Sequence, residues 1–216
     1  PYADCYRCPL KLEYPTCGIA CADFAREVVK RETTGALAAI LIEPIQGTAG
    51  NIVPPPEFMK AVKEIAKEND ALLVSDEMIC GFGRSGKWFG CEHSDTIPDV
   101  MTIGKSLGAG FPVSGLVSTD ALTQAKPFGN PSGSSSSYGG NPMAGAAALA
   151  SISIIEDENL VENARTLGAF IKARFEEMME KHPFIGHVRG EGLLIGVELV
   201  RDRKTKQPLA KDVCVR

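Results

Sequence analysis

Short apolar runs recur in the first half of the chain and predict the strands of a sheet. They cover residues 36–42, 71–74, 99–103 and 114–118, with polar residues, glycine or proline around them. Continuous apolar runs of this length are typical of strands buried on both faces, as in a parallel sheet. Between the first two runs, residues 56–70 carry apolar side chains at helical spacing behind Pro56, which predicts a strand–helix–strand unit.

The rest of the chain shows longer helical patterns and two more strands. A helix is expected at 18–31, and two long helices at about 142–156 and 158–181. The runs "FIGHVRG" and "GLLIGVELV" predict two strands around a glycine turn, and residues 201–208 a polar turn. The fold class is therefore α/β, with a mainly parallel sheet and helices on both faces.

Three polar residues each stand at the end of a predicted strand. Glu43 follows the first run, Asp76 the second and Lys105 the third. In an open α/β sheet, ligands bind outside the carboxyl ends of the strands. We therefore expect these three side chains to converge on one crevice.

Lys105 lies in Gly104-Lys105-Ser106, which is also the end of a phosphate-binding P-loop. That motif needs a glycine five residues before Gly104, where this chain has Asp99. The acidic strand that such nucleotide hydrolases place after the lysine here comes before it, as "ALLVSDE". Both departures argue against nucleotide hydrolysis.

A lysine amine that forms a Schiff base fits the pattern better. Such a lysine must be held at a defined place facing an electrophile, and pyridoxal phosphate supplies an aldehyde. The cofactor also needs a carboxylate beside its pyridine nitrogen, which Asp76 can provide. The Ser- and Gly-rich loop at 129–142 can offer donors to a phosphate.

Five motifs, in this order, resemble those of class III, fold-type I, pyridoxal-phosphate-dependent aminotransferases. They cover nearly the whole chain: "EPIQGTAG" (43–50), "SDEMICGFGRSGKWFG" (75–90), "PDVMTIGKSLGAGFPVSG" (98–115), "YGGNPMAGAAALA" (138–150) and "VRGEGLLIGVEL" (188–199). The resemblance implies a partial large cofactor-binding domain at 1–184 and the beginning of a small α+β C-terminal domain at 185–216.

The resemblance also implies residue roles. Lys105 would carry the internal aldimine and then move the proton between the substrate Cα and the cofactor. Asp76 would pair with the pyridine nitrogen, and Met78 would lie against the ring face. Ser137 matches a threonine that reaches the phosphate of the neighbouring subunit, which implies a homodimer with composite sites. Glu43 matches a glutamate near the substrate.

One departure and two missing parts limit the resemblance. Many relatives have glutamine where this chain has Ile79, and isoleucine cannot hydrogen-bond the ring oxygen of the cofactor. The chain opens at Pro1 and stops at Arg216, so we expect a fragment. It would lack an N-terminal phosphate loop, an aromatic residue stacked on the ring, and most of the C-terminal domain with its substrate-carboxylate arginine.

Composition changes this picture little. The net charge is −4 and the basic residues are scattered, which argues against nucleic acid or acidic membranes as partners. No apolar run approaches the length of a membrane span.

The chain has seven cysteines. A chain of this size with a large core does not need disulfide bonds for stability, which favours reduced thiols and a cytoplasmic protein. Four of the cysteines form a C-x2-C…C-x3-C cluster that is compatible with zinc: Cys5, Cys8, Cys17 and Cys21.

The sequence thus predicts a transaminase that moves an amino group from an amine, an ω-amino acid or a related amino acid to a 2-oxo acid. A racemase or aminomutase of the same family is the alternative. A non-catalytic, zinc-stabilised binding module is a remote one that depends on the first 21 residues alone. The sequence does not define the amino donor or the acceptor.

Overall fold

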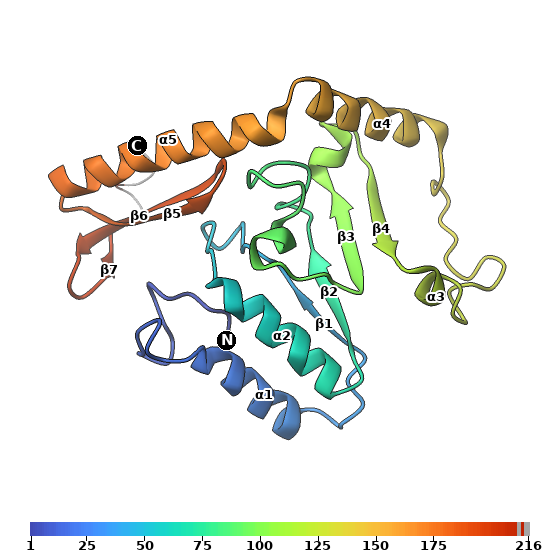
Figure 1. Cartoon of the computed structure of the whole chain (residues 1–216), viewed down its shortest axis with the longest axis horizontal. Coiled ribbons are helices and arrows are strands. Elements are labelled where there is room, and N and C mark those ends of the chain that lie inside the picture. Colours follow the sequence, from blue (N-terminus) through green and yellow to red (C-terminus); the bar gives the residue numbers. More distant parts are fainter. Residues whose placement is uncertain (211–212, 214–216) are drawn as a thin grey trace.

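A four-stranded sheet forms the centre of the molecule (Figure 1). The computed structural model describes residues 1–210 and 213. The strands lie in the order β1 (Ala39–Ile42), β2 (Leu72–Asp76), β3 (Val100–Gly104) and β4 (Ser114–Ser118). The first three run parallel, whereas β4 returns antiparallel to β3. The four apolar runs are therefore strands, and the predicted α/β class with a mainly parallel sheet is confirmed.

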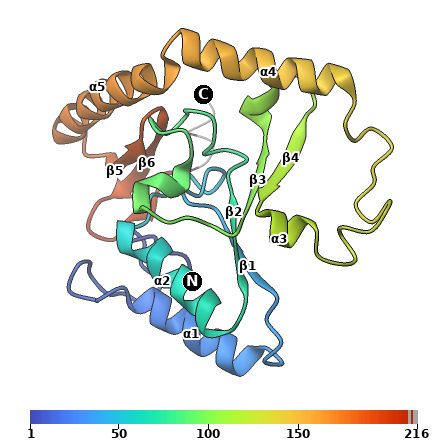
Figure 2. The ribbon, with the colours of Figure 1, turned by 45° about the vertical axis from the view of Figure 1, so that its right-hand side comes forward.

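Two helices, α1 (Ala20–Glu32) and α2 (Pro56–Glu68), pack with β1 and β2 (Figure 2). Pro56 occupies the first turn of α2, where its missing N–H costs nothing. The buried side of α2 joins one apolar cluster with Ala22 of α1 and Leu73 of β2. That side consists of residues at helical spacing: Phe58, Met59, Val62, Ile65 and Ala66.

The expectation of strands buried on both faces is wrong for the two outer strands. Leu41 of β1 is 65% exposed and Leu116 of β4 is 50% exposed. Each of these strands has a neighbour on one side only within the described sheet. On β2, by contrast, Leu73 and Ser75 are fully buried, because β2 has a strand on each side.

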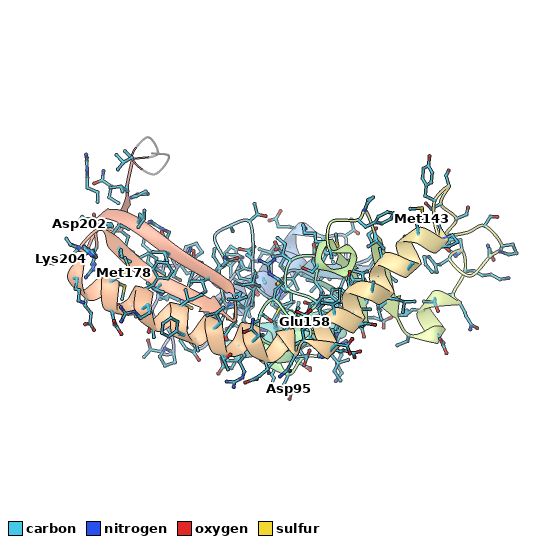
Figure 3. All side chains as sticks on the ribbon, turned by 90° about the horizontal axis from the view of Figure 1, so that it is seen from above. Asp95, Met143, Glu158, Met178, Asp202 and Lys204 are labelled. Atoms are coloured by element: carbon cyan, nitrogen blue, oxygen red, sulfur yellow. The ribbon has the colours of Figure 1, made fainter. Side chains whose placement is uncertain are left out.

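Two long helices, α4 (Pro142–Asp157) and α5 (Leu160–Lys181), span the length of the molecule (Figure 3). Figure 3 shows Met143 at one end of this pair and Met178 near the other, with Glu158 at the junction between the helices. Asn141 caps α4, because its side-chain oxygen accepts the Ala144 N–H at 2.9 Å. The loop before α4 follows the short helix α3 (Asp120–Thr123) and extends away from the sheet (Figure 1).

A second, antiparallel sheet lies at the C-terminal end. It consists of β5 (Ile185–Glu191), β6 (Leu194–Asp202) and β7 (Gln207–Pro208). The polar turn predicted at 201–208 is therefore confined to 203–206, and the residues on either side of it belong to β6 and β7. Helix α5 packs on β5. The N-terminal segment also reaches this sheet, since the Tyr6 ring stacks on His187 with ring centres 4.5 Å apart. The division at residue 185 stays a prediction.

None of the helices in the described part of the chain combines the length and the apolar character that crossing a membrane would require.

Glycines let α5 approach the turn between β5 and β6 closely. A Cβ on Gly168 would overlap the backbone of Gly192, whereas a Cβ on Gly145 of α4 would meet nothing within 4 Å. We predict that Gly168→Ala lowers the free energy of unfolding by about 1–3 kcal/mol through overpacking. Gly145→Ala is the matched helical control and should leave stability equal or about 0.5–1 kcal/mol higher. Urea unfolding measures both, and equal effects of the two changes would contradict the close packing.

Candidate active site

The parallel register brings the ends of β1, β2 and β3 to one edge of the sheet. Ile42 aligns with Ser75, and Asp76 aligns with Thr102. Glu43 therefore begins the segment after β1, beside the end of β2, and Lys105 begins the segment after β3. The three residues that the sequence pattern singled out thus follow neighbouring strands at the same edge, as expected for a ligand-binding crevice in an open α/β sheet.

Asp76 is half-buried and is held through one of its two oxygens. Its Oδ1 accepts the Met78 N–H at 3.0 Å and the Thr102 hydroxyl at 3.2 Å. Within the described residues, Oδ2 accepts no hydrogen bond. The carboxylate is therefore oriented, with one oxygen available to a cationic N–H donor.

Lys105 starts a short 3-10 turn, η2 (Lys105–Gly108), directly after β3. Its backbone is in the left-handed region with φ +44°, which costs a non-glycine residue about 1–2 kcal/mol. Its side chain is exposed. Such strain at a strand end is common where a side chain is held for function.

Met78 packs directly against the residue before this lysine. A Cβ added to Gly104 would lie 2.5 Å from Met78 Cε and 2.8 Å from Met78 Sδ. Only glycine at position 104 allows the thioether to sit there. Met78 thus places an apolar side chain next to the end of β3, while its N–H bonds Asp76.

Glu77, next to Asp76, points into the protein instead. It is completely buried and accepts hydrogen bonds from the Gly90 N–H at 2.7 Å, the Cys91 N–H at 2.9 Å and the Ser75 hydroxyl at 3.1 Å. Successive residues on a strand face opposite sides, which explains the different surroundings of two adjacent carboxylates. Glu77 fixes the segment η1 (Gly90–Ser94) and has no oxygen facing the crevice edge.

Glu43 belongs to a tight loop after β1. Its Oε2 accepts the Gly47 N–H at 3.0 Å, and Tyr2 donates its hydroxyl to the Glu43 carbonyl at 3.0 Å. Ile79 lies against the same loop, since a Cβ on Gly47 would be 2.6 Å from Ile79 Cδ1. The Ile79 side chain thus supports the loop that holds Glu43.

A cavity of about 450 Å³ opens beside this loop. Glu43, Gln46 and Asp76 supply its polar lining, and side chains of α1, α2 and β1 supply the apolar part. A cavity of this size with few polar groups is typical of a small-molecule site.

Ser137 is not part of this assembly. It is exposed in the loop between α3 and α4, which leaves the body of the sheet (Figures 1 and 2). The chain therefore does not bring Ser137 to its own Asp76 and Lys105 edge, and the predicted contact with a neighbouring subunit stays a prediction.

The cysteine cluster shows no metal centre. Cys5, Cys8, Cys17 and Cys21 line one small pocket, and all four thiols are free. Burial, and then the neighbouring thiols, raise the pKa of Cys5 to about 11, which keeps it protonated at neutral pH. Among the residues described, no three histidine, cysteine or acidic side chains are arranged to hold a metal ion.

The parallel sheet, with Lys105 and an oriented Asp76 after neighbouring strands, is typical of an α/β protein that binds a ligand at its strand ends. The family model "Aminotransferase class-III" matches residues 3–216, and the chain belongs to this family.

Individual relatives fall into two activities. The leucine/methionine racemase of Thermococcus litoralis is 43% identical over 208 residues, which are 96% of this chain and 46% of the racemase. The taurine–pyruvate aminotransferase of Bilophila wadsworthia is 38% identical over 222 residues, covering 93% of this chain and 48% of that enzyme. A Bacillus anthracis aminotransferase structure superposes with a TM-score of 0.89 at 36% identity, covering 99% of this chain and 48% of that one. The chain thus spans about half the length of these relatives.

Sequence reasoning did not identify Thr102 as part of this region, and it considered Glu77 only as the alternative to Asp76. Thr102 is a polar residue inside the apolar run "DVMTI", three places before Lys105, and that position was a usable signal. For Glu77, strand alternation after Asp76 predicts the opposite face. Its partners on η1 carry no signal in the sequence, because they are backbone N–H groups.

The buried carboxylate of Glu77 should be important for stability. In Glu77→Gln, an amide NH2 replaces one of the two carboxylate oxygens. The NH2 group cannot accept a hydrogen bond, so the N–H of Gly90 or of Cys91 loses its acceptor. We predict a loss of about 2–3 kcal/mol in the free energy of unfolding. Asp95→Asn is the control, because the Asp95 side chain is 97% exposed, and it should change little. Urea unfolding of both variants checks this, and a Glu77→Gln protein as stable as the control would refute the role.

Proposed function

We propose that the whole protein is a pyridoxal-phosphate-dependent aminotransferase that moves an amino group from an amine, an ω-amino acid or a related amino acid to a 2-oxo acid. The single observation that carries this is the position of an oriented Asp76 at the end of β2 and of Lys105 directly after the neighbouring β3. Membership of the class III aminotransferases supports it.

The residues at this edge fit the cofactor. Asp76 has an oxygen free within the described structure, as a partner for a protonated pyridine nitrogen would need. Met78 offers an apolar surface and Lys105 an exposed amine. When bound, pyridoxal phosphate supplies an aldehyde and an electron-accepting ring.

Lys105 has two tasks in this proposal. Its amine would hold the cofactor covalently and, once the substrate amine has displaced it, would move the proton between the substrate Cα and the cofactor. Asp76 keeps the ring nitrogen protonated, because a carboxylate at hydrogen-bond distance favours the charged form. Glu43 is proposed to face the substrate from the loop after β1.

A racemase is the second candidate, and the 43% identity to the leucine/methionine racemase supports it. Racemisation needs the proton at Cα to return on the opposite face, without a 2-oxo acid acceptor. Chiral analysis of an amino acid incubated with the full-length protein, with and without pyruvate, separates the two activities. Amino transfer requires the acceptor, whereas inversion does not.

Lys105→Ala in the full-length protein should abolish amino transfer, because its amine is the proposed covalent attachment point. Borohydride reduction of the wild type, followed by peptide mass mapping, should find the cofactor on Lys105. Lys87→Ala is the control, since Lys87 donates to the Glu92 carbonyl, and it should retain the label. Label on Lys87 or Lys126 in the wild type would overturn the assignment.

We also propose that the active unit is a two-fold dimer in which Ser137 reaches the cofactor phosphate of the partner. Exposed apolar side chains on β4 and α4 support this: Leu116, Val117, Met143 and Leu149. Hybrids of a Lys105→Ala chain and a Ser137→Ala chain, separated by two affinity tags, should contain one intact and one doubly damaged site. They should recover about half of the wild-type activity, because each site draws on both chains. An active monomer in sedimentation would contradict this.

A further inference from the structure

Thr102 contacts the end of β2 through two separate groups. Its backbone carbonyl accepts the Glu77 N–H at 3.0 Å, and its hydroxyl donates to Asp76 Oδ1 at 3.2 Å. Thr102 and Asp76 are aligned in the parallel register although they are 26 residues apart in the chain. The backbone contact belongs to the strand pairing, whereas the hydroxyl contact depends on this particular side chain.

The hydroxyl adds a restraint that the local turn does not provide. The Met78 N–H, two residues after Asp76, fixes Oδ1 from the same segment. A carboxylate held by one donor can still pivot about that hydrogen bond. A second donor from a different strand limits this pivot, and because both bonds end on Oδ1, Oδ2 keeps its capacity to accept a bond from a ligand.

These contacts connect the ends of β2 and β3 to each other at more than one point. Thr102 lies on the strand that ends immediately before Lys105. Asp76 accepts from Met78, and the Met78 side chain packs on Gly104 of that same strand. The orientation of Asp76 and the position of Lys105 are thereby tied to one rigid strand. The Thr102 hydroxyl is neutral, so it orients the carboxylate without neutralising its charge as a lysine or arginine would.

We propose that Thr102 is a positioning residue, whose hydroxyl aims Asp76 at the pyridine nitrogen of the cofactor. This inference rests on the proposed function. Thr102 acts through Asp76 and does not touch the reacting atoms.

The test is Thr102→Val in the full-length enzyme, which removes the hydroxyl but keeps the β-branched shape and the backbone bond to Glu77. A misdirected carboxylate should lower kcat about tenfold with KM for the amino donor within about twofold. The affinity of the apoenzyme for pyridoxal phosphate, measured by fluorescence titration, should fall several-fold. Thr102→Ser should recover most of both losses.

The matched control is Thr96→Val. Thr96 is buried, whereas Thr102 is half-buried, and the Thr96 hydroxyl donates to the Ser94 carbonyl at 3.2 Å rather than to Asp76. It should leave kcat and cofactor affinity unchanged. The pair Thr102→Ser and Thr102→Ala isolates the same hydroxyl where the valine variant does not fold.

The outcomes separate the inference from the function. Wild-type kcat and cofactor affinity in Thr102→Val, or an equal loss in Thr96→Val, would overturn the positioning role alone. A wild-type protein that binds no pyridoxal phosphate would overturn the proposed function and the inference with it. A loss confined to Thr102→Val and Thr102→Ala, with recovery in Thr102→Ser, supports both.

Discussion

Parallel pairing of β1, β2 and β3 is the constraint on which the candidate site depends. In a parallel sheet, all strands end at the same edge, so residues that follow different strands become neighbours. Glu43, Asp76 and Lys105 are separated by about thirty residues each along the chain. The register between β2 and β3 then places Asp76 beside Thr102. A shift of one residue in this register would turn the Asp76 side chain to the other face.

Burial and strand alternation give two adjacent carboxylates different tasks. Glu77 has donors for both of its oxygens and no access to solvent, so its charge stabilises η1. Asp76 has donors for one oxygen and lines the cavity, so its charge remains available to a ligand. The same chemical group is therefore structural in one place and suited to binding in the next, because burial and hydrogen-bond partners differ between the two.

The sequence predicted what depends on local pattern. Apolar runs located all four strands of the main sheet, and the polar residues after them located the edge that carries Asp76 and Lys105. The antiparallel return of β4 and the exposure of Leu41 and Leu116 depend on which strands become neighbours, which periodicity does not encode. The bond from Thr102 to Asp76 joins side chains 26 residues apart, so the polar position of Thr102 was visible in the sequence but its partner was not. The role proposed for Ser137 needs a second chain, which periodicity within one chain does not encode.

The segment between Glu77 and η1 connects the site to the C-terminal sheet. Glu77 holds one end of it, while Arg84 accepts the Leu193 N–H at 2.9 Å through its carbonyl. His93 adds a hydrogen-bonding contact of 3.0 Å to Ser85 on the same segment. Burial lowers the pKa of His93, so at neutral pH this contact is a neutral one. The β5–β6 turn is therefore joined by a hydrogen bond and close backbone packing to the segment that Glu77 anchors, and Glu77 directly follows Asp76.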